Sequence, residues 1–134
     1  MGGKHQMQFK RQEGFRFVFN EPIEASFKLM EDGEVVEPNT NLPCKILDIS
    51  PHGVKMFVDK LNGEYINKAN LQVQLQFVLD VTTIQAIGDI VWRKPLGQGA
   101  QYGILFHAQE NIDELIISEM KLRRKKEVLQ SKKR

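Results

Sequence analysis

Apolar and polar residues alternate along much of the chain, with the period of two that is typical of a half-buried β-strand. The clearest run covers residues 71–79, where Leu, Val and Phe alternate mostly with Gln. Five further segments show the same alternation or a short apolar run, at 23–29, 42–47, 54–58, 82–92 and 100–106. We therefore predict six strands and an all-β fold, because a helix does not place its apolar residues at this period.

Turn-forming residues separate the predicted strands. Asp32-Gly33 is a strong signal for a hairpin after the first strand. The segment from Pro95 to Gly99 predicts a flexible connection between the last two strands. Short strands at regular spacing, divided by turns, favour a small antiparallel barrel.

The period changes at about Asn111, and the residues that follow predict a helix that runs to about Leu129. The helix should pack onto the barrel through an apolar stripe made of Ile112, Leu115, Ile116 and Met120. Because this stripe ends near Met120, we expect the basic cluster Arg123–Lys126 to remain in solvent and the end of the helix to fray.

The 134 residues suit one domain, and the 41% of them that are hydrophobic suffice for a modest core. The predicted parts are a basic N-terminal arm at residues 1–20, the barrel at 21–108, the C-terminal helix at 109–130 and a basic tail at 131–134. The predicted fold class is therefore all-β, a six-stranded antiparallel barrel with a C-terminal α-helix.

Charge is strongly segregated along the chain, although the net charge is only +2. Residues 1–16 carry +3 and residues 121–134 carry +7, which leaves −8 on the body between them. A nucleic-acid polymer needs a basic groove, so the acidic body argues against such a partner. A basic arm can still capture a small phosphate ligand.

Membrane proteins, disulfide-rich proteins and metalloproteins are disfavoured by the composition. No apolar run approaches the ~20 residues that span a bilayer, so we expect no membrane insertion. Cys44 is the single cysteine and cannot form an internal disulfide, which favours a reducing, cytoplasmic location. No Cys/His cluster has the spacing of metal ligands, so we expect neither a metal nor a cofactor.

Catalytic groups are scarce in the sequence. The three histidines, His5, His52 and His107, lie far from one another along the chain. Ser50 is close to His52, but no nucleophile-elbow pattern and no third group accompany the pair. We therefore expect no enzyme activity.

The turn Asp48–Gly53 is the segment best suited to bind a ligand. It places the carboxylate of Asp48, the hydroxyl of Ser50 and the bare backbone of Gly53 between two predicted strands. A carboxylate can accept two N–H bonds from a guanine edge, and glycine lets a ligand approach closely. The same residue types also build ordinary turns, so a purely structural turn is the alternative.

The N-terminal arm is a second candidate for ligand binding, because it holds Arg11 and Arg16. Each guanidinium can bind a phosphate, or the O6/N7 edge of guanine, through two hydrogen bonds. The alternative is a solvated basic tail.

The arm, the turn and two later segments occur in the order found in PilZ domains, and the chain resembles this family over about residues 10–120. The two later segments are Gly88–Arg93 and Tyr102–Phe106. The family motif (Asp/Asn)-x-Ser-x-x-Gly is matched by Asp48, Ser50 and Gly53. The resemblance implies a PilZ-like barrel that binds the bacterial second messenger cyclic di-GMP and couples this binding to a protein partner.

The first motif of the family, Arg-x-x-x-Arg, is matched only in part, because Gln12 stands four residues before Arg16 and Arg11 lies one residue earlier. The resemblance implies a ligand site formed by Arg11, Gln12, Arg16, Asp48, Ser50 and Gly53. In this site the arginines would bind phosphate and the O6/N7 edge of guanine, and Asp48 would accept from its N1 and N2 donors.

Two alternatives remain open at this point. If Arg11 cannot take the place of the missing arginine, the chain is instead a degenerate PilZ-like protein-interaction module that does not bind the nucleotide. Trp92 can either stack on a base or fill the core, and we expect it in the core, where a lone strand tryptophan is more often found.

Overall fold

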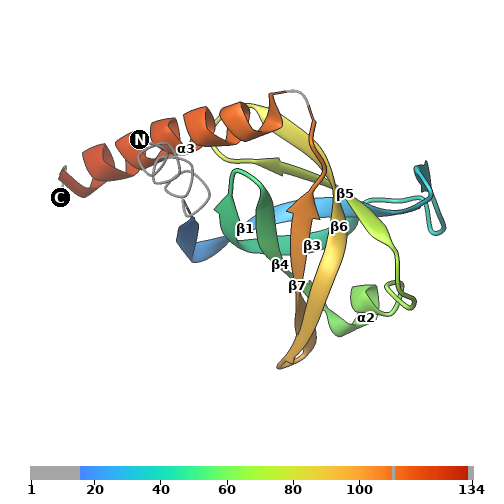
Figure 1. The fold of residues 1–134 in the computed structure, drawn as a ribbon. Coiled ribbons are helices and arrows are strands. Elements are labelled where there is room, and N and C mark those ends of the chain that lie inside the picture. Colours follow the sequence, from blue (N-terminus) through green and yellow to red (C-terminus); the bar gives the residue numbers. More distant parts are fainter. Residues whose placement is uncertain (1–15, 110, 133–134) are drawn as a thin grey trace, which may run out of the picture.

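The structure is a computed structural model, and it describes residues 16–109 and 111–132. In this part of the chain six strands form a closed antiparallel barrel, and helix α3 (Ile112–Lys132) crosses one end of it and extends past its side (Figure 1). The strands of the barrel are β1 (Phe17–Glu31), β3 (Leu42–Ser50), β4 (Gly53–Asp59), β5 (Gln72–Val78), β6 (Thr83–Leu96) and β7 (Gly99–Phe106).

The strands follow the order β1-β3-β4-β7-β6-β5 around the barrel, and the pairing of β1 with β5 closes it. The predicted fold class, a six-stranded antiparallel barrel with a C-terminal helix, is therefore confirmed. The boundaries differ slightly from those expected. Strand β1 already begins at Phe17, within the predicted arm, and α3 begins at Ile112 and continues past residue 130.

Two short elements complete the described fold. Strand β2 (Glu34–Val35) pairs with the end of β1 through the predicted hairpin, whose turn residues Asp32 and Gly33 have φ angles of 52° and 83°. Helix α2 (Lys60–Gly63) is a single turn after β4, and the carboxylate of Asp59 caps it by accepting from the Asn62 N–H at 2.9 Å.

The connection between β6 and β7 is a tight hairpin, so the prediction of a flexible segment from Pro95 to Gly99 was wrong. Strand β6 pairs with β5 only as far as Asp89, and beyond that residue β7 is its single neighbour among the described strands. Because its other edge is then open, Pro95 fits into the strand without breaking a ladder of hydrogen bonds. Gly97 turns the chain with a φ of 55°.

The core is one continuous cluster inside the barrel, and alternate residues of each strand contribute to it. Its most deeply buried members include Phe27, Ile46, Met56, Val73, Leu75 and Ala86. Helix α3 adds Ile116 and Met120, which are fully buried, and Ile112 and Leu115, which pack at its margin. The predicted apolar stripe of the helix is thus confirmed. Burial of such a side chain contributes about 1.5–3 kcal/mol.

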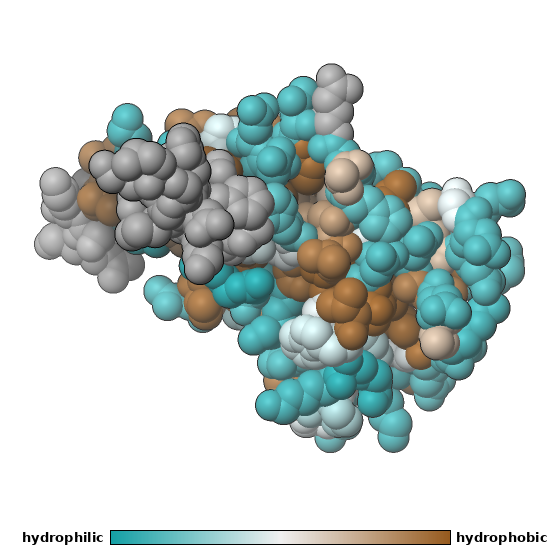
Figure 2. Space-filling view, in the orientation of Figure 1, coloured by the Kyte–Doolittle hydropathy of each residue, from teal (hydrophilic) through white to brown (hydrophobic). Residues whose placement is uncertain are grey.

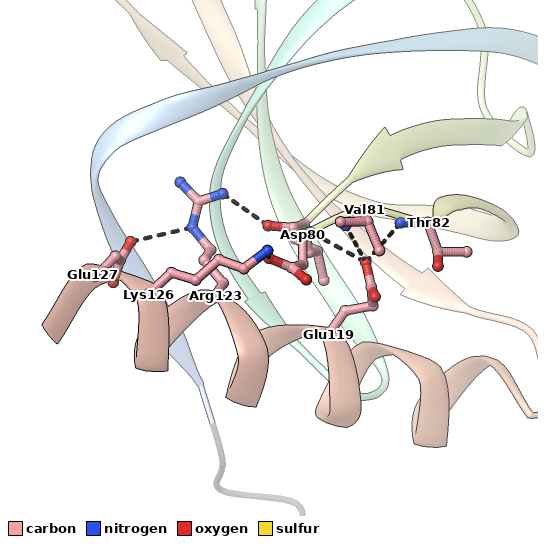
Figure 3. Close-up of polar contacts among 8 residues, drawn as sticks. Asp80, Val81, Thr82, Glu119, Arg123, Lys126 and Glu127 are labelled. Carbon is pink, nitrogen blue, oxygen red and sulfur yellow. Dashed lines mark hydrogen bonds and ion pairs between the residues drawn. The ribbon is translucent and has the colours of Figure 1, made fainter. Parts of the chain in front are cut away.

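Polar contacts also hold α3 against the loop that follows β5 (Figure 3). Glu119 is buried, and its Oε1 atom accepts from the backbone N–H groups of Asp80, Val81 and Thr82 at 3.1, 3.0 and 3.0 Å. Arg123 donates to the carbonyl oxygen of Leu79 at 2.9 Å. We call this set of contacts the α3 latch.

We predicted that the basic cluster Arg123–Lys126 remains in solvent, and Arg124, Lys125 and Lys126 are exposed, whereas Arg123 is half-buried. Lys126 Nζ lies 2.8 Å from Asp80 Oδ1, and the guanidinium groups of Arg123 and Arg124 lie over the rings of Phe19 and Phe17, 5.2 and 4.9 Å from the ring centres. The prediction is therefore wrong for Arg123 alone, because it counted only apolar residues as packing groups, whereas a charged side chain near a helix end can also bind a backbone carbonyl and an aromatic face.

Candidate functional site

A pocket of about 360 Å³ lies beside the turn between β3 and β4. Its lining comes from the residue before β1, from strands β3, β4, β6 and β7, and from the turn between β3 and β4. The lining residues are Arg16, Asp48, Ser50, His52, Gly53, Val54, Lys55, Val91, Trp92, Gly103, Ile104 and Leu105. Exposed apolar side chains border it, including Val91 and Leu105. In the space-filling view, hydrophobic surface gathers over the strands in the middle of the molecule and hydrophilic surface surrounds it (Figure 2).

One row of residues crosses four strands on the outer face of the barrel at this pocket. Asp48 of β3 is paired with Lys55 of β4, Lys55 with Gly103 of β7, and Gly103 with Trp92 of β6. Residues paired in this way point to the same side of an antiparallel sheet. The pocket is therefore built from rigid strands.

Two register shifts bring this row to the outside. One lies between Ile46 and Asp48 and the other between Ile90 and Trp92. An extra residue in a strand reverses the side to which the next residue points. Trp92 is consequently 43% exposed and lines the pocket, so the prediction that it fills the core was wrong. Strict alternation from the buried Ala86 would point the side chain of Trp92 into the barrel, and only the bulge turns it outward.

Asp48 is the charged centre of the pocket. Its side chain is only 5% exposed, and each of its oxygens faces a cation. Arg16 Nη1 donates to Oδ1, and Lys55 Nζ lies 3.3 Å from Oδ2. Charge-assisted bonds of this kind offset the loss of hydration that a buried carboxylate suffers. The pocket thus carries one more positive than negative charge among these three groups.

The turn after Asp48 is held by its own residues. The hydroxyl of Ser50 donates to the carbonyl oxygen of Gly53 at 3.4 Å and accepts from the N–H of His52 at 3.3 Å. One lone pair of this hydroxyl remains for another donor. A Cβ atom on Gly53 would lie 2.3 Å from the carbonyl oxygen of Ile104, so glycine is required where β4 approaches β7.

Four of the predicted site residues meet at this one pocket, namely Arg16, Asp48, Ser50 and Gly53. Arg11 and Gln12 lie outside the described residues. The sequence interpretation missed Lys55, although a signal was present. A two-residue turn at Pro51-His52 pairs Ser50 with Gly53, and counting outward from that pair places Lys55 opposite Asp48.

A second polar cluster lies next to the pocket, around Asp89. Its Oδ1 atom is 2.8 Å from Nε2 of His107 and accepts from Nε2 of Gln72 at 3.2 Å. The hydrogen bond with His107 holds the pKa of Asp89 below its usual value. Asp89 is paired with Leu105, which lines the pocket, so this cluster lies one strand away from that border.

Residues 16–109 and 111–132 show neither a metal site nor a membrane-spanning helix. This part of the chain contains no group of three or more His, Cys, Asp or Glu residues that could hold a metal ion. None of its helices is long and apolar enough to cross a membrane.

The fold and the pocket define a small β-barrel domain with an external polar site. The PilZ domain family model matches residues 6–122, and the chain therefore belongs to the PilZ domain family. A solved structure described as the PilZ domain with c-di-GMP of YcgR from Escherichia coli has the same fold. The match has a TM-score of 0.60 and 11% sequence identity, and it covers 90% of this chain and 96% of that chain. No curated protein matches the chain.

Proposed function

We propose that this protein is a receptor for cyclic di-GMP that acts by binding and not by catalysis. The observation that carries the proposal is the meeting of Arg16 with the buried carboxylate of Asp48 in an outer pocket of a PilZ barrel. The structural relative from Escherichia coli is described as a complex with c-di-GMP, which supports the same ligand class.

Each group of the pocket suits one part of such a ligand. The carboxylate of Asp48 can accept from the N1 and N2 donors of guanine, and Arg16 can bind a phosphate or the O6/N7 edge. The exposed indole of Trp92 offers a face on which a base can stack, and such stacking is worth about 1–3 kcal/mol per base. Ser50 and Gly53 shape the turn beneath the ligand. Arg11 and Gln12 belong to the proposed site as parts of the arm.

The proposal includes coupling to a protein partner in the bacterial cytoplasm. Support for coupling comes from the two residues Phe17 and Phe19, which follow Arg16 closely in the chain and lie against Arg124 and Arg123 of α3. A ligand that binds Arg16 therefore acts close to the helix. The proposed location rests on the single cysteine, Cys44, which is a buried free thiol and has no second cysteine with which to form an internal disulfide.

Titration of the purified chain with cyclic di-GMP tests the proposal. We expect micromolar or tighter binding, equivalent to about −8 kcal/mol. Trp92 is the single tryptophan and lines the pocket, so its fluorescence should change with occupancy in step with the heat measured by calorimetry. GTP at equal concentration serves as the control ligand. Absence of both signals near millimolar ligand would refute the proposal and leave the protein-interaction module as the function.

A further inference from the structure

We propose that Lys55 is a ligand-binding residue of this pocket, and that its ammonium group passes from Asp48 to a phosphate when the nucleotide binds. The inference rests on the proposed function, since it concerns how the same site binds its ligand. Lys55 lines the pocket, and its Nζ atom lies 3.3 Å from Oδ2 of Asp48.

The position of Lys55 is fixed by the sheet. Strand β4 is paired on both sides, so Lys55 faces Asp48 on one side and Gly103 on the other. Gly103 has no side chain, and a Cβ atom there would lie 2.1 Å from Nε1 of Trp92, so the indole covers this glycine. Lys55 thus stands between the carboxylate that can hold guanine and the ring on which a base can stack.

Charge balance shows what Lys55 would contribute. Arg16 and Lys55 share the single negative charge of Asp48. A guanine that donates N1–H and N2–H to Asp48 is neutral, and it competes with both cations for the carboxylate oxygens. Cyclic di-GMP carries two negatively charged phosphates. These can pair with Arg16 and Lys55 once guanine has replaced the two cations at Asp48.

The side chain of Lys55 has the freedom for this exchange. It is 36% exposed, against 5% for the carboxylate of Asp48, so the ammonium can turn while the carboxylate stays in place. A lysine ammonium carries three rotatable donors on a flexible stem and can change its partner without a movement of the backbone.

The test compares Lys55→Met with Lys45→Met by calorimetry with cyclic di-GMP. Both changes remove one positive charge from neighbouring strands, but Lys45 pairs with Glu24 at 3.8 Å and does not line this pocket. We expect Lys55→Met to weaken binding by about 10–100-fold, as loss of a charged hydrogen bond does, and Lys45→Met to change it less than twofold. Lys55→Arg should retain binding within a few-fold.

Ionic strength separates a phosphate contact from a role in positioning Asp48. Lys55→Met should make binding less sensitive to added salt, because one charge pair with the ligand is lost. Unchanged salt sensitivity, or wild-type affinity of Lys55→Met, would overturn the inference while the proposed function stands. If the wild-type chain itself gives no binding, the proposed function fails instead, and the two failures are therefore distinguishable. Thermal unfolding of each variant confirms that it is folded.

Discussion

Arg16 is the more exposed of the two cations at Asp48, with 49% of its side chain accessible against 36% for Lys55. A half-exposed guanidinium can bind an incoming phosphate with little loss of hydration. Asp48 keeps Lys55 as a partner if Arg16 is removed, so the pocket should survive that change.

We predict that Arg16→Ala weakens cyclic di-GMP binding by about 10–100-fold, since a bidentate charged contact is worth about 1–3 kcal/mol. Lys28→Ala is the matched control, because Lys28 lies on β1, the strand that Arg16 directly precedes, but does not line the pocket. Calorimetry at fixed salt measures both variants. Unchanged affinity of Arg16→Ala would exclude the arm from the site.

Single residues show where sequence interpretation works and where it stops. The Asp48, Ser50 and Gly53 positions could be found because a turn motif keeps its residues adjacent in the chain. Trp92 could not be assigned, since one bulge reverses its side of the sheet and no sequence signal marked that bulge. Arg16 was found as a candidate, but its contact with Asp48 spans 32 positions and appears only in the fold.

At the level of elements, the strands and the helix followed from their hydrophobic periods, whereas the attachment of α3 did not. Period identifies the face that buries Ile116 and Met120. The period does not predict the burial of Glu119, a charged residue on the same face. Glu119 is buried because a loop presents three N–H groups to one of its carboxylate oxygens. Such a contact depends on the shape of a distant loop.

The α3 latch yields a prediction about stability. Glu119→Ala should lower the free energy of unfolding by about 1–3 kcal/mol, because it removes a buried carboxylate that accepts hydrogen bonds from three backbone N–H groups. Urea unfolding followed by circular dichroism measures the loss. Glu114→Ala, an exposed position in the first turn of the same helix, should cost less than about 1 kcal/mol. Equal effects of the two changes would show that the latch does not stabilise the fold.

For the whole molecule, the central question is how the pocket and α3 influence each other. The chain joins them within a few residues, because Arg16 lies at Asp48 while Phe17 and Phe19 lie under Arg124 and Arg123. Contacts that hold the start of β1 also hold Arg16 in place at Asp48. Preorganisation of this kind lowers the cost of binding, and the coupling acts equally in both directions.

We therefore predict that Arg124→Met weakens cyclic di-GMP binding by about 2–5-fold, although Arg124 does not line the pocket, because one cation–π contact at an exposed site is worth about 0.5–1 kcal/mol. Lys125→Met is the control, since it removes the same charge from the next residue of the helix.

If simple attraction between the basic helix and the phosphates were responsible, both variants would weaken binding equally. If only Arg124→Met does so, and hydrogen exchange at Phe17–Phe19 becomes faster in that variant alone, the helix acts on the pocket through the start of β1. Equal affinity of both variants and the wild type would show that α3 and the pocket are independent.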